Sequence, residues 1–180
     1  SGDTGLGKTF LSACIARTVA DNGYSVMYES AGHLFANLER AKFSGDEQAR
    51  KESDRYFACD LLIVDDLGTE MPGQFVTSAL YNLVNDRILA GKPMVISTNL
   101  NAEELARRYS PQIASRLLGH FNCRRFEGED IRPSALRNPC LCAAHKHLFA
   151  VGACNRANHK LGAEHILVRH LISRLILGVG

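Results

Sequence analysis

The sequence lacks the features of a membrane protein or of a secreted, disulfide-linked protein. It contains no run of about 18 apolar residues and no secretory signal. Its six cysteines follow no regular disulfide framework. Neither a zinc-finger nor an aromatic-rich RNA-binding signature is present. These absences predict a soluble, cytoplasmic protein with no membrane partner.

The composition predicts one globular domain followed by a tail. The chain has 180 residues, of which 46% are hydrophobic, enough for a sizeable core. Charge is unevenly spread along the chain. Residues 1–132 hold 15 basic and 18 acidic residues, whereas residues 133–180 hold six basic residues and one acidic residue. We therefore predict a domain over 1–132 and an atypical basic tail over 133–180.

Strand-like and helix-like patterns alternate through residues 1–132. This alternation predicts an α/β fold, with a mostly parallel sheet flanked by helices. The predicted strands cover 24–29, 61–64, 94–97 and 121–126. The predicted helices cover 8–21, 31–41, 73–89 and 113–118, with a charged surface helix within 44–57 and a short helix capped by Asn101.

A glycine-rich segment at the start carries the strongest chemical signal. It fits the phosphate-binding pattern G-x-x-x-x-G-K-[ST] at every fixed position. The glycines allow backbone N–H groups to point at phosphate oxygens, Lys8 supplies positive charge, and the Thr9 hydroxyl can bind Mg²⁺. The predicted nucleotide-binding residues are Gly2, Asp3, Thr4, Gly5, Leu6, Gly7, Lys8 and Thr9.

Only Ser1 precedes this loop, although such a loop normally joins a buried strand to a helix. The first strand of the sheet is therefore apparently missing, and we expect a fragment whose sheet exposes unpaired edges.

Two acidic residues follow the apolar run at 61–64. A carboxylate at the end of a buried strand lies where ligands of open α/β sheets bind. We predict that Asp65 holds Mg²⁺ and that Asp66 orients or deprotonates the attacking water, with Glu70 as the alternative.

Three further polar residues are candidates for the same reaction. Asn99 follows the strand at 94–97, where an amide can bond the γ-phosphate or the attacking water, although it can also simply cap the next helix. Arg116 is predicted to reach the nucleotide of a neighbouring subunit, and Arg132 to contact the nucleotide of its own. The pairs Arg107-Arg108 and Arg124-Arg125 are expected to be solvated surface residues rather than contacts to nucleic acid.

Residues 2–132 resemble the ATPase domain of the DnaC/IstB-like family of bacterial helicase loaders and transposition helper ATPases. The similar segments are 2–9, 61–70, 80–100 and 113–117. The resemblance implies an AAA+ P-loop fold, ATP and Mg²⁺ as cofactors, self-association, and Arg116 as the trans-acting arginine. It also implies a DnaB-type helicase or a transposase as partner, with single-stranded DNA nearby.

Other functions remain open at this stage. A small-molecule kinase is disfavoured because no arginine-rich lid is evident, and a GTPase because no Asn-Lys-x-Asp motif occurs. A non-catalytic interaction fragment is the third alternative. We also expect two departures from the family, the lack of an N-terminal partner-binding region and an extension beyond Arg132. The tail contains Cys140, Cys142, His145 and His147, but their spacing is not a usual zinc pattern, and we expect a poorly packed tail.

Overall fold

The computed structural model describes residues 1–128 and 130. The predicted tail, its cysteines and histidines, and Arg132 lie outside these residues. The chain runs through α1 (Lys8–Asp21), β1 (Val26–Ser30), α2 (Ala31–Phe43), α3 (Glu47–Ala58), β2 (Leu61–Leu67), α4 (Gln74–Leu89), β3 (Met94–Thr98), α5 (Ala102–Arg108) and α6 (Pro111–His120). Within the described part of the chain, no helix is long and apolar enough to cross a membrane.

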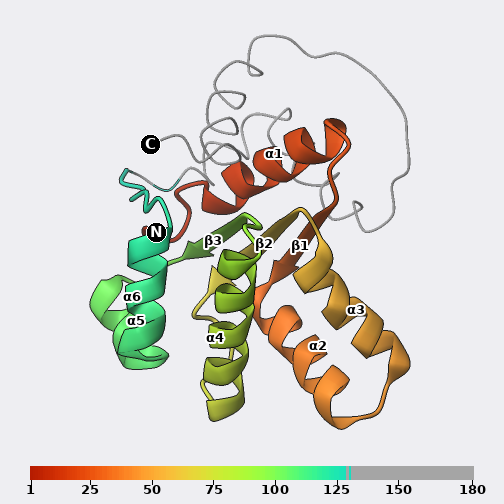
Figure 1. Cartoon of the computed structure of the whole chain (residues 1–180). Helices are drawn as coiled ribbons and strands as arrows, with labels where there is room; N and C mark the ends of the chain where they lie inside the picture. The colour runs from red at the N-terminus through yellow and green to blue at the C-terminus, as the bar shows by residue number, and fades with distance from the viewer. Residues whose placement is uncertain (129, 131–180) are drawn as a thin grey trace.

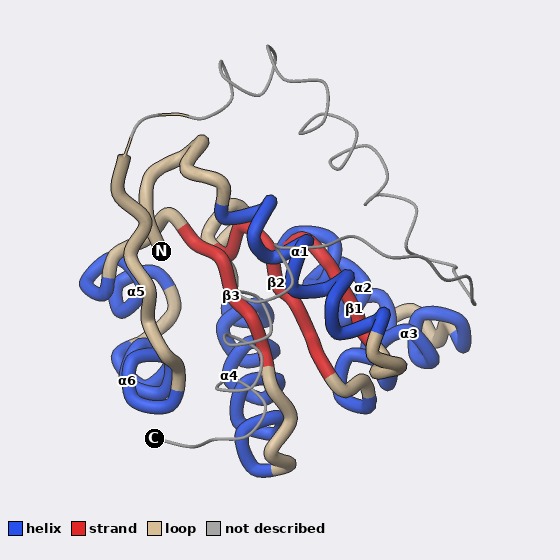
Figure 2. The backbone as a smooth tube through the Cα atoms, turned by 90° about the horizontal axis from the view of Figure 1, so that it is seen from above, coloured by secondary structure: helices blue, strands red, loops and turns tan. Residues whose placement is uncertain are grey.

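The strands form a parallel sheet with β2 in the centre, in the order β1-β2-β3. Helix α1 covers one face, and α2 and α4 lie on the opposite side with α3 beside them (Figures 1 and 2). Helices α5 and α6 pack together next to α4. The predicted α/β fold with a parallel sheet is confirmed.

The central strand is buried on both faces, which explains its continuous apolar run. Leu61 and Ile63 pack with α1, whereas Leu62 and Val64 belong to the larger core on the other side. Side chains alternate along a strand, so a strand covered on both faces needs apolar residues at every position.

Side-chain caps mark the starts of α3, α5 and α6. Asn101 accepts the Glu104 N–H while the Glu104 carboxylate accepts the Asn101 N–H, a complete capping box that confirms the predicted cap of α5. Asp46 accepts two N–H groups at the start of α3. Ser110 caps α6, and Pro111 stands at its first position, where a missing N–H costs nothing.

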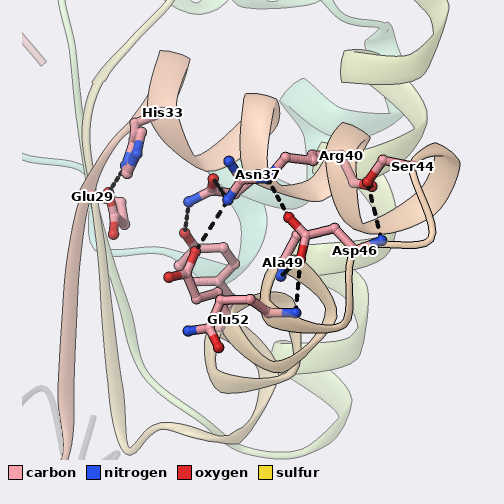
Figure 3. Close-up of polar contacts among 10 residues, drawn as sticks. Glu29, His33, Asn37, Arg40, Ser44, Asp46, Ala49 and Glu52 are labelled. Atoms are coloured by element: carbon pink, nitrogen blue, oxygen red, sulfur yellow. Dashed lines mark hydrogen bonds and ion pairs between the residues drawn. The ribbon is translucent and has the colours of Figure 1, made fainter.

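Polar contacts fasten α2 to α3 (Figure 3). The Asn37 amide donates to the Tyr56 hydroxyl at 2.9 Å, and Arg40 lies 3.4 Å from Asp46 and 3.7 Å from Glu52. Burial raises the pKa of Tyr56 to about 12, so its phenol stays neutral and can accept the amide. The charged helix predicted within 44–57 is thus held as an antiparallel partner of α2.

Arg87 is buried at the end of the sheet where the strands begin, with 1% of its surface exposed. Its guanidinium donates to the carbonyls of Tyr56, Cys59 and Pro93 at 2.7, 3.2 and 2.8 Å. These carbonyls precede β2 and β3, so one α4 side chain fixes the starts of two strands. Helical periodicity alone gives no indication of this role.

The strand predicted over 121–126 is wrong. This segment adopts neither helix nor strand. Its backbone bonds are to Ser1, whose carbonyl accepts the Phe126 N–H at 2.7 Å and whose amino group donates to the Arg124 carbonyl at 2.6 Å. A strand requires a ladder partner, and β3 pairs only with β2 among the described residues.

Candidate functional site

The glycine-rich loop connects Ser1 to α1 and has the geometry of an anion cradle. Gly5 and Gly7 adopt φ angles of 81° and 83°, a left-handed conformation that favours glycine. Gly7 is the N-cap of α1 and provides no side-chain cap. The first N–H groups of α1 therefore have no capping side chain, as in helices that bind phosphate at their N-terminus.

Lys8 folds back over its own loop. Its ammonium donates to the carbonyls of Gly2 and Asp3, both at 2.6 Å, and only 8% of its surface is exposed. These partners are neutral, so among the described residues the buried ammonium group is held by dipoles. Anionic phosphate oxygens would satisfy it better.

The chain segment that follows α6 lies against this loop. A Cβ built on Gly5 would come within 2.2 Å of the Asp130 carboxyl group, and one on Gly2 within 2.5 Å of the Phe126 carbonyl. Any larger side chain at either glycine would clash. The carboxylate of Asp130 therefore lies directly beside Gly5 of the glycine-rich loop.

Asp65 lies near the carboxyl end of β2 with 6% of its surface exposed. One carboxylate oxygen, Oδ2, accepts the Tyr28 hydroxyl at 2.8 Å, and the other, Oδ1, accepts the Ser97 hydroxyl. Both donors are uncharged. Among the described residues, no basic side chain lies within ion-pair distance of this buried anion, whose burial is costly without a nearby cation.

Tyr28 connects this carboxylate to the helix that follows the loop. Its hydroxyl lies 2.8 Å from Asp65 Oδ2 and 3.5 Å from the Thr9 carbonyl. Burial, followed by the negative charge of Asp65, raises the pKa of Tyr28, so it remains a neutral donor. One hydroxyl therefore spans the predicted metal-binding residues Thr9 and Asp65.

The donor set fits magnesium. Mg²⁺ takes few protein ligands, keeps several waters and binds substrate phosphates. Within residues 1–128 and 130, no group of three or more His, Cys, Asp or Glu could hold a metal ion alone. One carboxylate and one hydroxyl beside a phosphate loop match such a shared site.

Asp66 adopts a strained backbone conformation at the carboxyl end of the sheet. Its φ of 55° makes it the one described non-glycine residue with positive φ, a conformation that aspartate tolerates better than most. Its N–H donates to Ser97 Oγ at 2.9 Å rather than to a ladder carbonyl, and the β2–β3 register is irregular between Val64 and Leu67. The side chain is partly exposed.

Glu70, the alternative base, is enclosed by hydrogen bonds. Gly68 donates its N–H to Oε2 at 2.9 Å, while the Tyr109 hydroxyl and the Arg108 guanidinium approach Oε1. Burial and the Glu70 carboxylate raise the pKa of Tyr109, which stays a donor. Glu70 thus ties the loop after β2 to the end of α5.

Asn99 follows β3 directly, and its side chain is exposed. The neighbouring Thr98 is buried, and its hydroxyl donates to the Leu67 carbonyl at 2.6 Å and accepts the Leu100 N–H at 3.0 Å. Thr98 is thus occupied in fixing the strand ends. Asn99 is the one of the two that solvent or a ligand can reach.

Arg116 contacts a residue of its own chain, Tyr81. Its guanidinium donates to the Tyr81 hydroxyl at 2.6 Å and lies 4.7 Å from the Tyr81 ring centroid. Its Nε is buried and has no hydrogen-bond partner in the described part of the chain. In this arrangement Arg116, on α6, contacts Tyr81 on α4.

A separate hollow of about 490 Å³ borders the Glu70 network. It is lined by Gly73, Gln74, Thr77, Ser78, Arg108 and Tyr109. None of the loop residues 2–9 contributes to it, so this hollow is distinct from the phosphate cradle.

Sequence patterns do not indicate the roles of four contributors, Tyr28, Ser97, Arg108 and Tyr109; Arg108, predicted to be a solvated surface residue, instead pairs with the buried Glu70. Each acts through a partner more than 30 positions away in the chain. The one sequence signal is the Ser97-Thr98-Asn99 run at a strand end, of which Asn99 is the predicted site residue.

A parallel sheet with a phosphate-binding loop before its first helix and an acidic pair at its carboxyl edge is the arrangement of a P-loop nucleotide-binding domain. The chain belongs to the family of IstB-like ATP binding proteins, whose family model matches residues 1–132. It is similar to an ATP-binding protein of an insertion sequence from Mycobacterium tuberculosis, with 26% identity over 98 residues, 54% of this chain and 38% of the relative.

The replicative helicase loader DnaC of Escherichia coli is 23% identical over 120 residues, which cover 65% of this chain and 48% of DnaC. The chain thus spans less than half the length of these two relatives. Among solved structures, the DnaC helicase loader superposes with a TM-score of 0.63 at 19% identity, over 70% of this chain and 75% of that one. AMPPCP-bound DnaA from Aquifex aeolicus superposes with a TM-score of 0.62 at 21% identity, over 98% of this chain and 51% of the DnaA chain.

Proposed function

We propose that this chain binds Mg²⁺-ATP and hydrolyses it in order to load or remodel a protein partner bound to DNA. One observation carries the ATP-binding part. The buried cation Lys8 and the buried anion Asp65 are each held by uncharged groups, and the Tyr28 hydroxyl connects their two elements. A magnesium-bound triphosphate supplies negative charge for Lys8 and positive charge for Asp65.

The residues take the following roles. The loop 2–9 and Lys8 bind the phosphates, while Thr9 and Asp65 hold the magnesium ion. Asp66, partly exposed, orients or deprotonates water, and the enclosure of Glu70 favours Asp66 over Glu70 for this role. Asn99 is proposed to bond the γ-phosphate or that water, and Arg132, outside the described residues, remains a candidate nucleotide contact.

The partner is proposed from the relatives. DnaC is named as a replicative helicase loader, and the mycobacterial relative belongs to an insertion sequence. One structural neighbour is DnaA bound to AMPPCP and single-stranded DNA, with a TM-score of 0.63 at 19% identity. We therefore propose a DnaB-type helicase or a transposase as partner in the cytoplasm, with single-stranded DNA nearby.

Self-association is proposed to complete the site. Arg116 would leave Tyr81 and approach the nucleotide of a neighbouring copy, where an arginine stabilises the transition state. In mixtures of Lys8→Ala and Arg116→Ala chains, each defective alone, turnover should recover if the arginine acts between copies. Absence of recovery, with the mixed assembly confirmed by sedimentation, would contradict the trans role.

The direct test is ATP turnover by the purified chain, with and without single-stranded DNA, beside Lys8→Ala as a control for contaminating ATPases. We expect turnover that requires Lys8 and rises when DNA is added. Phosphate transfer that depends on a small acceptor would instead indicate a kinase. Partner binding without any turnover would indicate a non-catalytic interaction module.

A further inference from the structure

Tyr28 occupies an unusual place between the sheet and α1. It lies in the middle of β1, opposite Ile63 in the register, two positions before Asp65 on the neighbouring strand. Its ring packs against the apolar cluster formed by α1 and the strands, which includes Ile15 and Val19. The ring is therefore a core group, while the hydroxyl extends to the polar carboxyl edge of the sheet.

The hydroxyl has only one hydrogen to donate. Asp65 Oδ2, at 2.8 Å, is the better acceptor because it is charged and closer than the Thr9 carbonyl at 3.5 Å. Ser97 donates to Oδ1 of the same carboxylate. Each carboxylate oxygen thus has one fixed hydroxyl donor, which sets the plane of the group and leaves further lone pairs for a ligand.

Packing alone would not require this hydroxyl. A phenylalanine would fill the same apolar cluster without bringing a polar group into it. The tyrosine oxygen instead meets two elements at once, the strand that carries Asp65 and the helix that carries Thr9.

We propose that Tyr28 is a positioning residue for the magnesium-binding carboxylate: its hydroxyl orients Asp65 toward the metal. This inference rests on the proposed binding of Mg²⁺-ATP. Groups that orient a metal ligand typically change metal affinity about 10- to 100-fold when they are removed.

The test measures the affinity of the full chain for a fluorescent ATP analogue across a magnesium titration and, separately, in EDTA. Tyr28→Phe removes one oxygen and retains the ring. We expect it to raise the magnesium concentration for half-maximal tightening about 10-fold, with EDTA affinity and melting temperature close to wild type. Ser97→Ala should shift the titration in the same direction. Tyr24→Phe, which alters a tyrosine that is 50% exposed just before β1, should leave it unchanged.

The outcomes separate the two claims. If wild-type chain shows no magnesium-dependent binding, the proposed function falls and this inference with it. If wild type responds to magnesium and Tyr28→Phe responds identically, only the positioning role is refuted. An equal loss of affinity with magnesium and in EDTA would also refute it, because it would indicate general damage to the loop.

Discussion

The two ends of the sheet differ in how their buried charged side chains are bonded. Where the strands begin, carbonyls from the last turn of α3 and from the segments before β2 and β3 converge on the Arg87 guanidinium. Where they end, Lys8 and Asp65 are nearly as buried and carry opposite charges; as for Arg87, their hydrogen-bond partners among the described residues are uncharged. The terminal nitrogens of Arg87 find acceptors within the chain, although its buried Nε has no partner among the described residues, whereas Lys8 and Asp65 would gain from an added anion and cation.

This difference separates a structural group from a ligand site more clearly than burial does. Arg87 and Lys8 are both buried cations that donate to backbone carbonyls. Arg87 joins segments distant in sequence, whereas Lys8 reaches back only to the carbonyls of Gly2 and Asp3. Substitutions at the first end should therefore alter folding, and those at the second end ligand binding.

The largest expected effect is on stability at the end with Arg87. Arg87→Met keeps a side chain of similar length but removes every donor, so several buried carbonyls lose their partners. We expect unfolding in urea to become easier by about 3 kcal/mol. Arg17→Met, on the exposed face of α1, should change stability by less than about 0.5 kcal/mol. Similar urea midpoints of unfolding for Arg87→Met and Arg17→Met would contradict the structural role of Arg87.

At the other end, Lys8→Ala should remove ATP binding while leaving the fold largely intact. A unit charge pair 4 Å apart at an effective dielectric of about 20 contributes ~4 kcal/mol, so we expect affinity to fall at least about 100-fold. Equilibrium binding of a fluorescent ATP analogue measures this. The control is Lys51→Ala, which alters an exposed lysine on α3. Retained affinity in Lys8→Ala would exclude the loop as the phosphate site.

Asp66→Asn should separate catalysis from binding within the same end. Loss of a general base typically slows a reaction about 100-fold or more, while affinity should change little because Asp66 is not proposed to hold phosphate or metal. Single-turnover hydrolysis and binding measure the two quantities. Glu70→Gln is the comparison, and its enclosed carboxylate predicts a lower melting temperature as its main effect. Unchanged hydrolysis in Asp66→Asn would transfer the role of base to Glu70.

The smallest expected effect concerns Asp130, whose carboxylate lies against Gly5. An anion there repels phosphate, so Asp130→Asn should tighten ATP binding about fivefold, corresponding to the ~1 kcal/mol between unit charges 4 Å apart in water. Glu127→Gln changes a nearby acid that pairs with Arg125 and should leave affinity unchanged. Weaker binding in Asp130→Asn would show that the carboxylate supports the loop.

Local patterns were sufficient for much of this architecture. The loop motif, the apolar run before Asp65 and the cap at Asn101 are contained within a few residues, and the fold predicted from them is confirmed. Tyr28 and Ser97 could not be assigned in this way, because their contacts depend on strand register, including the irregularity between Val64 and Leu67. The predicted strand at 121–126 failed for a related reason, since a strand exists only where a partner strand pairs with it.

The most direct test of a single magnesium-bound triphosphate between Lys8 and Asp65 is ATP affinity with and without Mg²⁺ in the Asp65→Asn chain. The account predicts that this variant binds ATP in EDTA at least as tightly as wild type does, because one anion is removed, but that its affinity does not increase when magnesium is added. If magnesium raised the ATP affinity of Asp65→Asn as much as it raises that of wild type, the account would be contradicted.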